Sequence, residues 1–266
     1  MLTGPPRPPR HPDDQLGRPF TLAMNTEIAT TSACGQLRSV WPPLHGHQGH
    51  LLTLDAVRRF YAEEIAAAAT AELPPALVEA LARVPRERFL GPGPWRIMRD
   101  ASRPGVAAYR RTPDADPRHL YHNVLVAIDA ERQLNNGQPS GNAIWIAAVE
   151  VRPGDRVVHI GAGVGYYTAI LAELTGSSGS VTAIEIDAAL AERARQNLAD
   201  HPWVTVLCGD GSAIPEADAI YVNAGCTHPC AEWLAALSDG GRLVLPADHR
   251  PHARRHRRAR LRAAAP

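Results

Sequence analysis

A glycine-rich loop in the second half of the chain has the composition and spacing that most directly suggest chemistry. Its glycines, Gly161, Gly163 and Gly165, follow the pattern G-x-G-x-G between an apolar run and a helix-like run. Glycine has no side chain, so a ligand can lie close to the backbone there. A dinucleotide fingerprint would need a third glycine where this chain has Tyr166, and the chain contains no G-x-x-x-x-G-K. The loop therefore favours a ligand other than a dinucleotide, and a tight turn without a ligand is the alternative.

Two acidic residues follow the loop at the ends of the next two apolar runs. Glu185 ends one run, and its carboxylate could accept hydrogen bonds from both hydroxyls of a ribose. Asp210 lies in the "GDG" that closes the following run and could accept from an adenine amino group. A solvated acid at a strand end is the alternative for each. Together with the glycine loop, these ends predict a nucleoside pocket.

The elements that must position these residues alternate between strands and helices. Strands are predicted near 155–161, 180–187, 203–210, 217–225 and 241–246, and helices near 141–150, 166–174 and 188–200. Ser140 is the predicted cap of the first of these helices. This order predicts an α/β fold with a Rossmann-like, doubly wound, mostly parallel sheet, whose ligand lies at the carboxyl ends of the strands.

The first half of the chain divides into two predicted regions. Residues 1–50 are rich in Pro, Gly, His and Ser and are predicted to be a disordered extension. Residues 51–130 form a predicted small helical region for the substrate, with helices at 52–73, capped by Thr53 or Asp55, and at 74–84. A loop is expected at 84–95 and a short strand or buried edge at 120–129.

The chain ends in an arginine-rich segment that follows the predicted binding domain at 131–247. Residues 248–266 carry seven arginines between 250 and 262, and all 28 basic residues of the chain are arginine, which indicates coding bias. A disordered tail is therefore preferred to a nucleic-acid-binding arm. The sheet is predicted to be C-terminally incomplete, with an open edge at the 241–246 strand that could pair with another chain in a homodimer.

Composition excludes several classes of protein. The net charge of +1 gives no general attraction to nucleic acid or membranes, and no apolar run reaches about 18 residues. The first residues lack the apolar core of a signal peptide, so a cytoplasmic location is expected. Four cysteines suggest no disulfide framework, and "CTHPC" at 226–230 lacks a second ligand pair, so no metal site is expected.

These segments also carry a resemblance to a known family. The runs "VVHIGAGVGYYTAILAEL", "AIEID" and "CGDGS" resemble the successive motifs of class I S-adenosyl-L-methionine-dependent methyltransferases. With "VPRERFLGP", "LNNGQPS" and "GGRLVLP" added, their order resembles protein-L-isoaspartate O-methyltransferases over about residues 75–246. The resemblance implies a methyltransferase with S-adenosyl-L-methionine as cofactor and a carboxylate of a protein or peptide as acceptor.

The resemblance also implies roles for particular residues. The glycines would line the methionine side of the cofactor, Glu185 would hold the ribose, and Asp210 with Gly211 the adenine. The residues expected to bind the cofactor are Gly161, Ala162, Gly163, Gly165, Glu185, Ile186, Asp210, Gly211 and Asn223. One departure is His159, at a strand position that is usually acidic in the family.

A second departure lies in the turn "LNNGQPS", where the family has a hydroxyl that orients the substrate. Here that position is Gly137, so Asn136 and Ser140 become the candidate donors, and the predicted catalytic residues are Asn136, Gly137 and Ser140. The alternative is that the turn only starts a helix. An acceptor carboxylate is ionised at neutral pH and needs no general base. The alternative functions are a weak or inactive cofactor-binding module and a nucleic-acid methyltransferase, which "VNAGCTHP" after the fourth strand disfavours.

Overall fold

The computed structural model describes residues 52–98, 109–226, 228–247 and 257–262. The predicted disordered extension at 1–50 lies outside these residues. No helix in the described part of the chain is long and apolar enough to cross a membrane.

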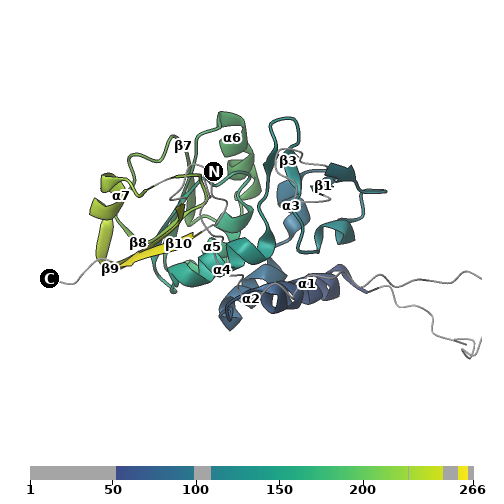
Figure 1. The fold of residues 1–266 in the computed structure, drawn as a ribbon, viewed down its shortest axis with the longest axis horizontal. Helices are drawn as coiled ribbons and strands as arrows, with labels where there is room; N and C mark the ends of the chain where they lie inside the picture. Colours follow the sequence, from purple (N-terminus) through teal and green to yellow (C-terminus); the bar gives the residue numbers. More distant parts are fainter. Residues whose placement is uncertain (1–51, 99–108, 227, 248–256, 263–266) are drawn as a thin grey trace, which may run out of the picture. The chain divides into compact units, whose positions relative to one another are not determined.

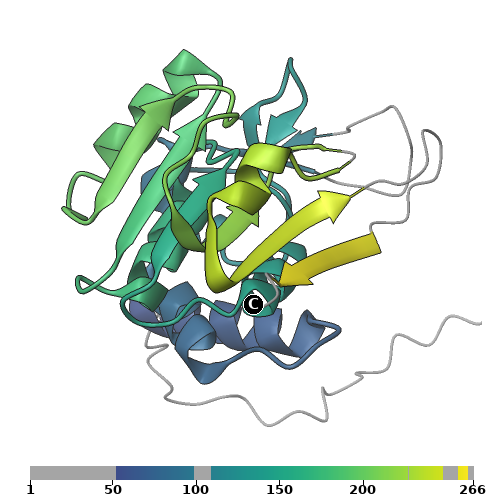
Figure 2. The same ribbon diagram turned by 90° about the vertical axis from the view of Figure 1, so that its left-hand side faces the viewer.

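A six-stranded sheet forms the centre of the described structure. Its order is β10-β9-β8-β5-β6-β7, and all neighbours are parallel except β10, which is antiparallel to β9 (Figure 2). The strands are β5 (Arg156–Ile160), β6 (Ser180–Glu185), β7 (Val204–Cys208), β8 (Ala217–Val222), β9 (Leu237–Ala247) and β10 (Arg257–Arg262). The predicted α/β fold with a mostly parallel sheet is therefore confirmed.

Helices cover both faces of this sheet, as a doubly wound fold requires. Adjacent residues of β5 face opposite sides of the sheet. Val157 packs in the core formed with α4, α5 and α6, whereas Val158 packs in the core that contains Trp233 of α7. The covering helices are α4 (Pro139–Val149), α5 (Tyr166–Thr175), α6 (Ala188–Asn197) and α7 (Ala231–Ala235). Strands that are covered by helices on both faces of a sheet have continuous apolar sequences. For this reason the strands could be predicted from the sequence.

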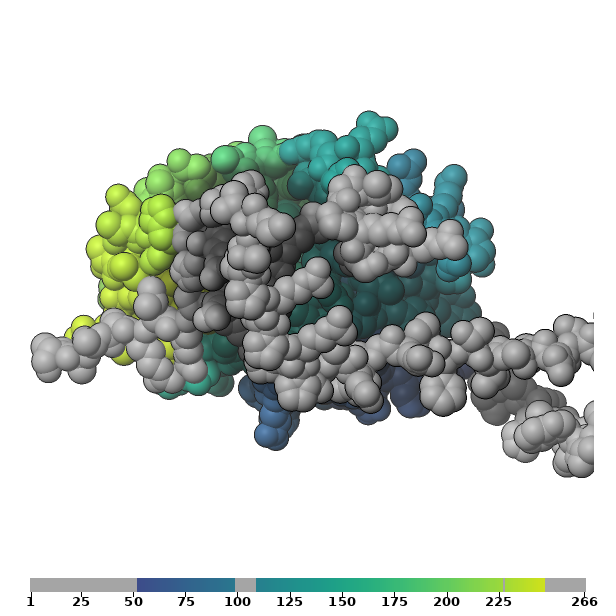
Figure 3. All heavy atoms as spheres, viewed as in Figure 1, coloured from purple at the N-terminus to yellow at the C-terminus, as the bar shows by residue number. Residues whose placement is uncertain are grey.

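The N-terminal region is a small helical layer that packs on the first of these faces. Helices α1 (Leu54–Ala68) and α2 (Pro75–Arg83) lie together against α4 and α5, below the sheet in Figure 1 and along the lower side of the space-filling view in Figure 3. Thr53 is the cap of α1, since its hydroxyl accepts from the N–H of Ala56 at 3.2 Å. The predicted helical region is present, with α1 shorter than the expected range.

The segment at 84–95, which was predicted to be a loop, contains a short helix. Helix α3 (Arg86–Leu90) is held by the buried guanidinium of Arg86, which donates to the carbonyls of Leu120, His122 and Val124 at 2.6, 3.2 and 2.8 Å. The prediction was wrong because these acceptors are distant in sequence. The remaining short elements are β1 (Arg96–Met98), β2 (Tyr109–Arg111), η1 (Pro117–Leu120), β3 (Ala127–Asp129) and β4 (Leu134–Asn135).

The C-terminal segment also differs from its prediction. Arg257–Arg262 form β10, paired residue by residue with Arg242–Ala247 of β9, so the prediction of a disordered tail was wrong for these residues. The edge of β9 that the sequence left open is therefore covered. This removes the reason for expecting a homodimer through that edge.

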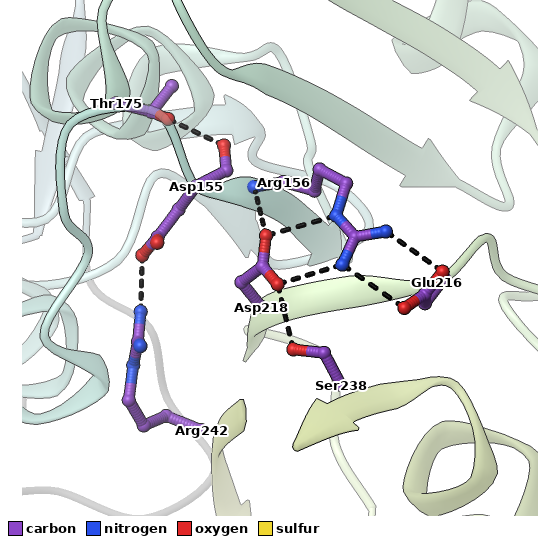
Figure 4. A network of polar contacts seen from close by, with 7 residues as sticks. All are labelled: Asp155, Arg156, Thr175, Glu216, Asp218, Ser238 and Arg242. Carbon is purple, nitrogen blue, oxygen red and sulfur yellow. Dashed lines mark hydrogen bonds and ion pairs between the residues drawn. The ribbon is translucent and has the colours of Figure 1, made fainter. Parts of the chain in front are cut away.

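Polar side chains tie the strands together at the end of the sheet opposite the glycine loop (Figure 4). Arg156 donates from its backbone and from Nε to Asp218 at 2.8 and 3.0 Å, and the hydrogen bonds from Arg156 hold the pKa of Asp218 well below its usual range. Ser238 donates to the same carboxylate at 2.7 Å. Nearby, the buried Arg242 is paired with Asp155. These contacts join β5, β8 and β9.

Candidate cofactor and acceptor site

A cavity of about 430 Å³ lies at the carboxyl ends of β5, β6, β7 and β8. Its wall is formed by four short segments from these ends, by two residues of the covering helices and by the hairpin that joins β3 to β4. The lining residues fall at 128–136, 160–163, 184–187, 209–210 and 223–225, with Tyr167 and Leu190. The volume lies in the range of about 300–1,000 Å³ that is usual for small-molecule sites.

The three glycines of the loop have two different roles. At Gly161, φ is +81° and an added Cβ would lie 2.8 Å from the backbone nitrogen of Ala224, so only glycine fits between the loop and the end of β8. Gly161 and Gly163 line the cavity. Gly165 does not line it. It precedes α5 with φ +91°, and an added Cβ would lie 2.8 Å from Leu198, so it allows close packing of α5 and α6.

Glu185 is the best-positioned carboxylate of the cavity. One of its oxygens accepts from the N–H of Gly163 at 2.7 Å and the other from the N–H of Asp187 at 3.0 Å. The side chain is therefore fixed between the glycine loop and the start of α6. A carboxylate oxygen can accept more than one hydrogen bond, so both oxygens can still receive ligand hydroxyls.

The "GDG" segment contributes one of its predicted residues to the wall. Asp210 lines the cavity, and its Oδ1 accepts from the N–H and the hydroxyl of Ser212 at 3.0 and 2.7 Å, which lowers the pKa of Asp210. Gly211 is not part of the wall. It is buried with φ +75°, and its carbonyl accepts from Trp233 Nε1 at 2.7 Å. Gly211 therefore contacts the protein interior and not the cavity.

An apolar side chain also faces the cavity. Ile186 is 72% exposed although it is a large aliphatic residue, and it lines the wall beside Glu185. Asn223 and Ala162 line the cavity as well. An exposed aliphatic side chain next to a fixed carboxylate suits a ligand with a flat apolar ring and a polyol.

The turn at 134–140 brings one of its three predicted catalytic residues to the cavity. Asn136 is only 6% exposed and lines the wall, its backbone N–H donates to Val126 at 2.9 Å, and its side-chain Nδ2 has no hydrogen-bond partner among the described residues. A buried amide donor without a partner is costly unless a ligand supplies one. Neither Gly137 nor Ser140 is part of the wall.

Ser140 is not the cap of α4, contrary to the prediction. Helix α4 begins at Pro139, with Gln138 at the cap position, so Ser140 lies in the first turn and is not the cap. Its N–H donates to Asn123 Oδ1 at 3.1 Å, and its hydroxyl accepts from Asn123 Nδ2 at 3.0 Å. This pair of bonds attaches the start of α4 to the 120–124 segment.

Position 137 has no room for a side chain, because a neighbouring side chain lies too close to it. Gly137 has φ +70°, and an added Cβ would lie 2.5 Å from Asn142 Nδ2. Asn142 is held in that place because it donates to the carbonyl of Gln138 at 3.0 Å and accepts from Tyr221 at 2.7 Å. Serine at 137 would therefore be strained, and restoring the family hydroxyl would require Asn142 to move.

His159 is a buried neutral residue of the fold. It is fully buried, stacks on Tyr221 with ring centroids 5.0 Å apart, and its Nδ1 lies 2.8 Å from Thr168 Oγ1. Burial lowers the pKa of His159 to about 3, so the ring is uncharged at neutral pH. The charge that the family usually has at this strand position is therefore missing in this chain.

Several residues of the wall were not expected from the sequence, among them Arg132, Tyr167 and Asp187. Arg132 lies between β3 and β4 and is one of 28 arginines, so its type gave no signal. Tyr167 is the second residue of α5, close behind the glycine loop, and that position was the available signal.

A parallel doubly wound sheet with a G-x-G-x-G loop, a fixed acid at the next strand end and a nucleoside-sized cavity defines the class of S-adenosylmethionine-dependent methyltransferases. A family model described as Protein-L-isoaspartate(D-aspartate) O-methyltransferase matches residues 112–263. A protein-L-isoaspartate O-methyltransferase of Ignicoccus hospitalis is 36% identical over 181 residues, which cover 66% of this chain and 74% of that protein. One of Methylorubrum extorquens is 38% identical over 177 residues, covering 64% and 65%.

Solved structures agree with these sequence relatives. A protein-L-isoaspartate O-methyltransferase superposes with a TM-score of 0.59 and 25% identity, covering 73% of this chain and 57% of that one. A Plasmodium falciparum β-aspartate methyltransferase, solved with S-adenosyl-L-homocysteine, has the same fold, with a TM-score of 0.55 and 14% identity over 78% and 95% of the two chains. The chain belongs to the protein-L-isoaspartate (D-aspartate) O-methyltransferase family, and its cofactor is S-adenosyl-L-methionine.

Proposed function

We propose that this chain methylates an isoaspartyl-like carboxylate of a protein or peptide, and that Asn136 orients that carboxylate. The observation that carries the proposal is the buried, unpartnered Nδ2 of Asn136 in the wall that also contains Gly161 and Gly163. An amide N–H suits an acceptor oxygen, and Asn136 lines the same cavity as the two glycines, which supports this role. Gly137 and Ser140 support the turn through the backbone and through Asn123.

The chemistry asks little of the chain beyond binding and orientation. Bound S-adenosylmethionine supplies a methyl group bonded to a positively charged sulfur. When the methyl group is transferred, this sulfur leaves as a neutral thioether without assistance. The acceptor carboxylate, with an ordinary pKa near 4, is ionised at neutral pH and attacks without a general base. The residues of the wall therefore need to align the two reactants and exclude water. Methylation of the isoaspartyl carboxylate gives a methyl ester. The following backbone nitrogen of the substrate then attacks the ester carbonyl and methanol leaves, which closes a succinimide without further help from the chain.

The cofactor is proposed to be held by the residues that the strand ends bring together. Glu185 receives the ribose hydroxyls, Ile186 and Asp210 contact the adenine, and Gly161, Ala162, Gly163 and Asn223 border the methionine part. Gly165 and Gly211 act indirectly, by packing the elements behind the wall. The preformed bonds of Glu185 to Gly163 and Asp187 support this arrangement.

Replacing Glu185 with alanine should weaken S-adenosylmethionine binding by about 1–3 kcal/mol, because buried hydroxyls of the ligand would lose their acceptor. Isothermal titration calorimetry measures the change directly. Glu185→Gln, which keeps the shape and an acceptor oxygen, should lose less. Glu192→Ala, on the exposed face of α6, is the control for loss of an acid nearby. Unchanged affinity in Glu185→Ala would show that the ribose lies elsewhere.

The acceptor is tested with two peptides that differ only in one linkage. Tritiated S-adenosylmethionine should label a peptide with an isoaspartyl residue, and the isomer with a normal aspartyl residue should stay unlabelled. The isomers have the same composition and charge, so the comparison isolates recognition of the shifted carboxylate. Cofactor binding without labelling of either peptide would contradict the proposal and favour a binding module with a regulatory role.

A further inference from the structure

An ion pair crosses the rim of the cofactor cavity. Arg132 Nη1 lies 2.6 Å from Asp187 Oδ2, and the two residues are 55 positions apart in the chain. Both line the cavity, Arg132 from the hairpin between β3 and β4, and Asp187 from the turn between β6 and α6. In the described structure, the hairpin and β6 belong to different sheets, so no hydrogen bonds of a sheet connect these two walls. The ion pair joins them.

The hairpin presents Arg132 in a defined position. Asp129 Oδ1 accepts from the N–H groups of Glu131 and Arg132, each at 3.1 Å, which fixes the tip of the hairpin. Behind the tip, the N–H of Asn136 donates to the carbonyl of Val126 at 2.9 Å. The tip is therefore a shaped turn, and its Arg132 guanidinium contacts Asp187 at the start of α6.

The two oxygens of Asp187 have separate partners. Oδ1 accepts from the N–H groups of Ala189 and Leu190, at 2.9 and 3.1 Å, and so caps α6. Oδ2 accepts from Arg132. The hydrogen bond from Arg132 lowers the pKa of Asp187, so the pair stays charged at neutral pH. The cap can therefore be kept while the contact with the hairpin is removed.

The charges of the wall make Arg132 difficult to replace. Three carboxylates line the described cavity, those of Glu185, Asp187 and Asp210, and Arg132 is the one basic side chain among its described lining residues. When Arg132 is absent, nothing basic in that wall can pair with Asp187. The hairpin tip would then have no charged contact with α6.

We propose that the Arg132–Asp187 ion pair holds the hairpin against α6 and slows dissociation of the cofactor. Leu134 and Asn135 of the hairpin line the same cavity as Ile186 and Leu190 of the α6 side, so parting the walls at this pair would open the site to solvent. Arg132 is a positioning residue, acting through the hairpin. The inference depends on S-adenosylmethionine binding alone and not on the proposed acceptor.

Dissociation of S-adenosylmethionine from the full chain, followed by stopped-flow displacement, tests this role. The variants are Arg132→Gln, which removes the charge, and Asp187→Asn, which keeps an oxygen for the α6 cap. Each should raise the dissociation rate constant about threefold at low salt, as expected for a partly exposed pair. The double variant should release the cofactor no faster than either single variant. High salt should accelerate release from the natural chain and leave Arg132→Gln unchanged.

Arg195→Gln is the matched control, because Arg195 is itself partly exposed and forms an ion pair with Glu192 on α6, outside the cavity. It should leave the dissociation rate constant unaltered. Equal release rates in Arg132→Gln and the natural chain, additive effects in the double variant, or faster release in Arg195→Gln would each overturn the proposal. Melting temperatures without cofactor separate these results from simple unfolding, since Arg132→Gln should leave the melting temperature nearly unchanged.

Discussion

Replacing Asn136 with alanine should reduce kcat for methyl transfer by about 30- to 1,000-fold, which corresponds to roughly 2–4 kcal/mol for one donor at a positioned site. The reason is that the Nδ2 of Asn136 is a buried donor with no partner in the described structure, at the wall shared with the glycine loop. Single-turnover transfer of the tritiated methyl group to an isoaspartyl peptide measures the effect. Affinity for S-adenosylmethionine, measured separately, should change little.

Asn136→Asp is the informative companion, because it has nearly the same size and replaces the amide donor with a second carboxylate. It should be at least as slow as Asn136→Ala, since two carboxylates would face each other. A single-turnover rate in Asn136→Ala equal to that of the natural chain would mean that the turn only starts α4. In that case the acceptor carboxylate is oriented by another part of the wall.

Replacing Arg242 with alanine should lower the free energy of unfolding by about 3–5 kcal/mol, the usual cost of removing one partner of a buried ion pair. Arg242 is only 3% exposed, its Nε donates to the carbonyl of Val149 at 3.1 Å, and its guanidinium pairs with Asp155. Without it, the carbonyl of Val149 loses a side-chain donor, and the partly buried Asp155 carboxylate keeps the N–H of Arg152 but loses its ion-pair partner. Urea unfolding followed by circular dichroism gives the free energy.

Arg156→Ala is the comparison for this experiment, because Arg156 belongs to the network in Figure 4 but its side chain is 43% exposed. Solvent screens such pairs, so its loss should cost less free energy of unfolding than the loss of Arg242. An equal decrease in the free energy of unfolding in the two variants would show that burial of the arginine does not determine the effect of removing it. Arg242→Met, which retains most of the volume, separates the lost hydrogen bonds from a lost packing contact.

The sequence predicted the sheet well because its strands are buried on both faces. Residues such as Val157 and Val158 are both apolar since each faces a different layer of helices. The positions of Glu185 and Asp210 followed from the same pattern, because the carboxyl ends of parallel strands meet at one edge. Local periodicity and topology together therefore located the cavity.

The sequence did not reveal contacts between distant segments. Helix α3 depends on Arg86 and carbonyls 34 to 38 positions away, and Ser140 is held by Asn123, 17 positions earlier. Strand β10 escaped prediction for another reason. Strand pairing uses main-chain groups that almost every residue has, so an arginine-rich segment can form a strand without the apolar alternation that would announce it.

The strand order also determines what an unfinished chain exposes during synthesis. β5, β6 and β7 precede β8 in the sequence, yet β5 lies between β6 and β8 in the sheet. Until β8 has left the ribosome, one side of β5 has unpaired main-chain groups at Val157 to Ile160, which later pair with β8. A nascent chain that ends before residue 217 therefore presents an apolar, open strand to other chains. This interval of translation, rather than the finished fold, is where the protein is most prone to aggregate.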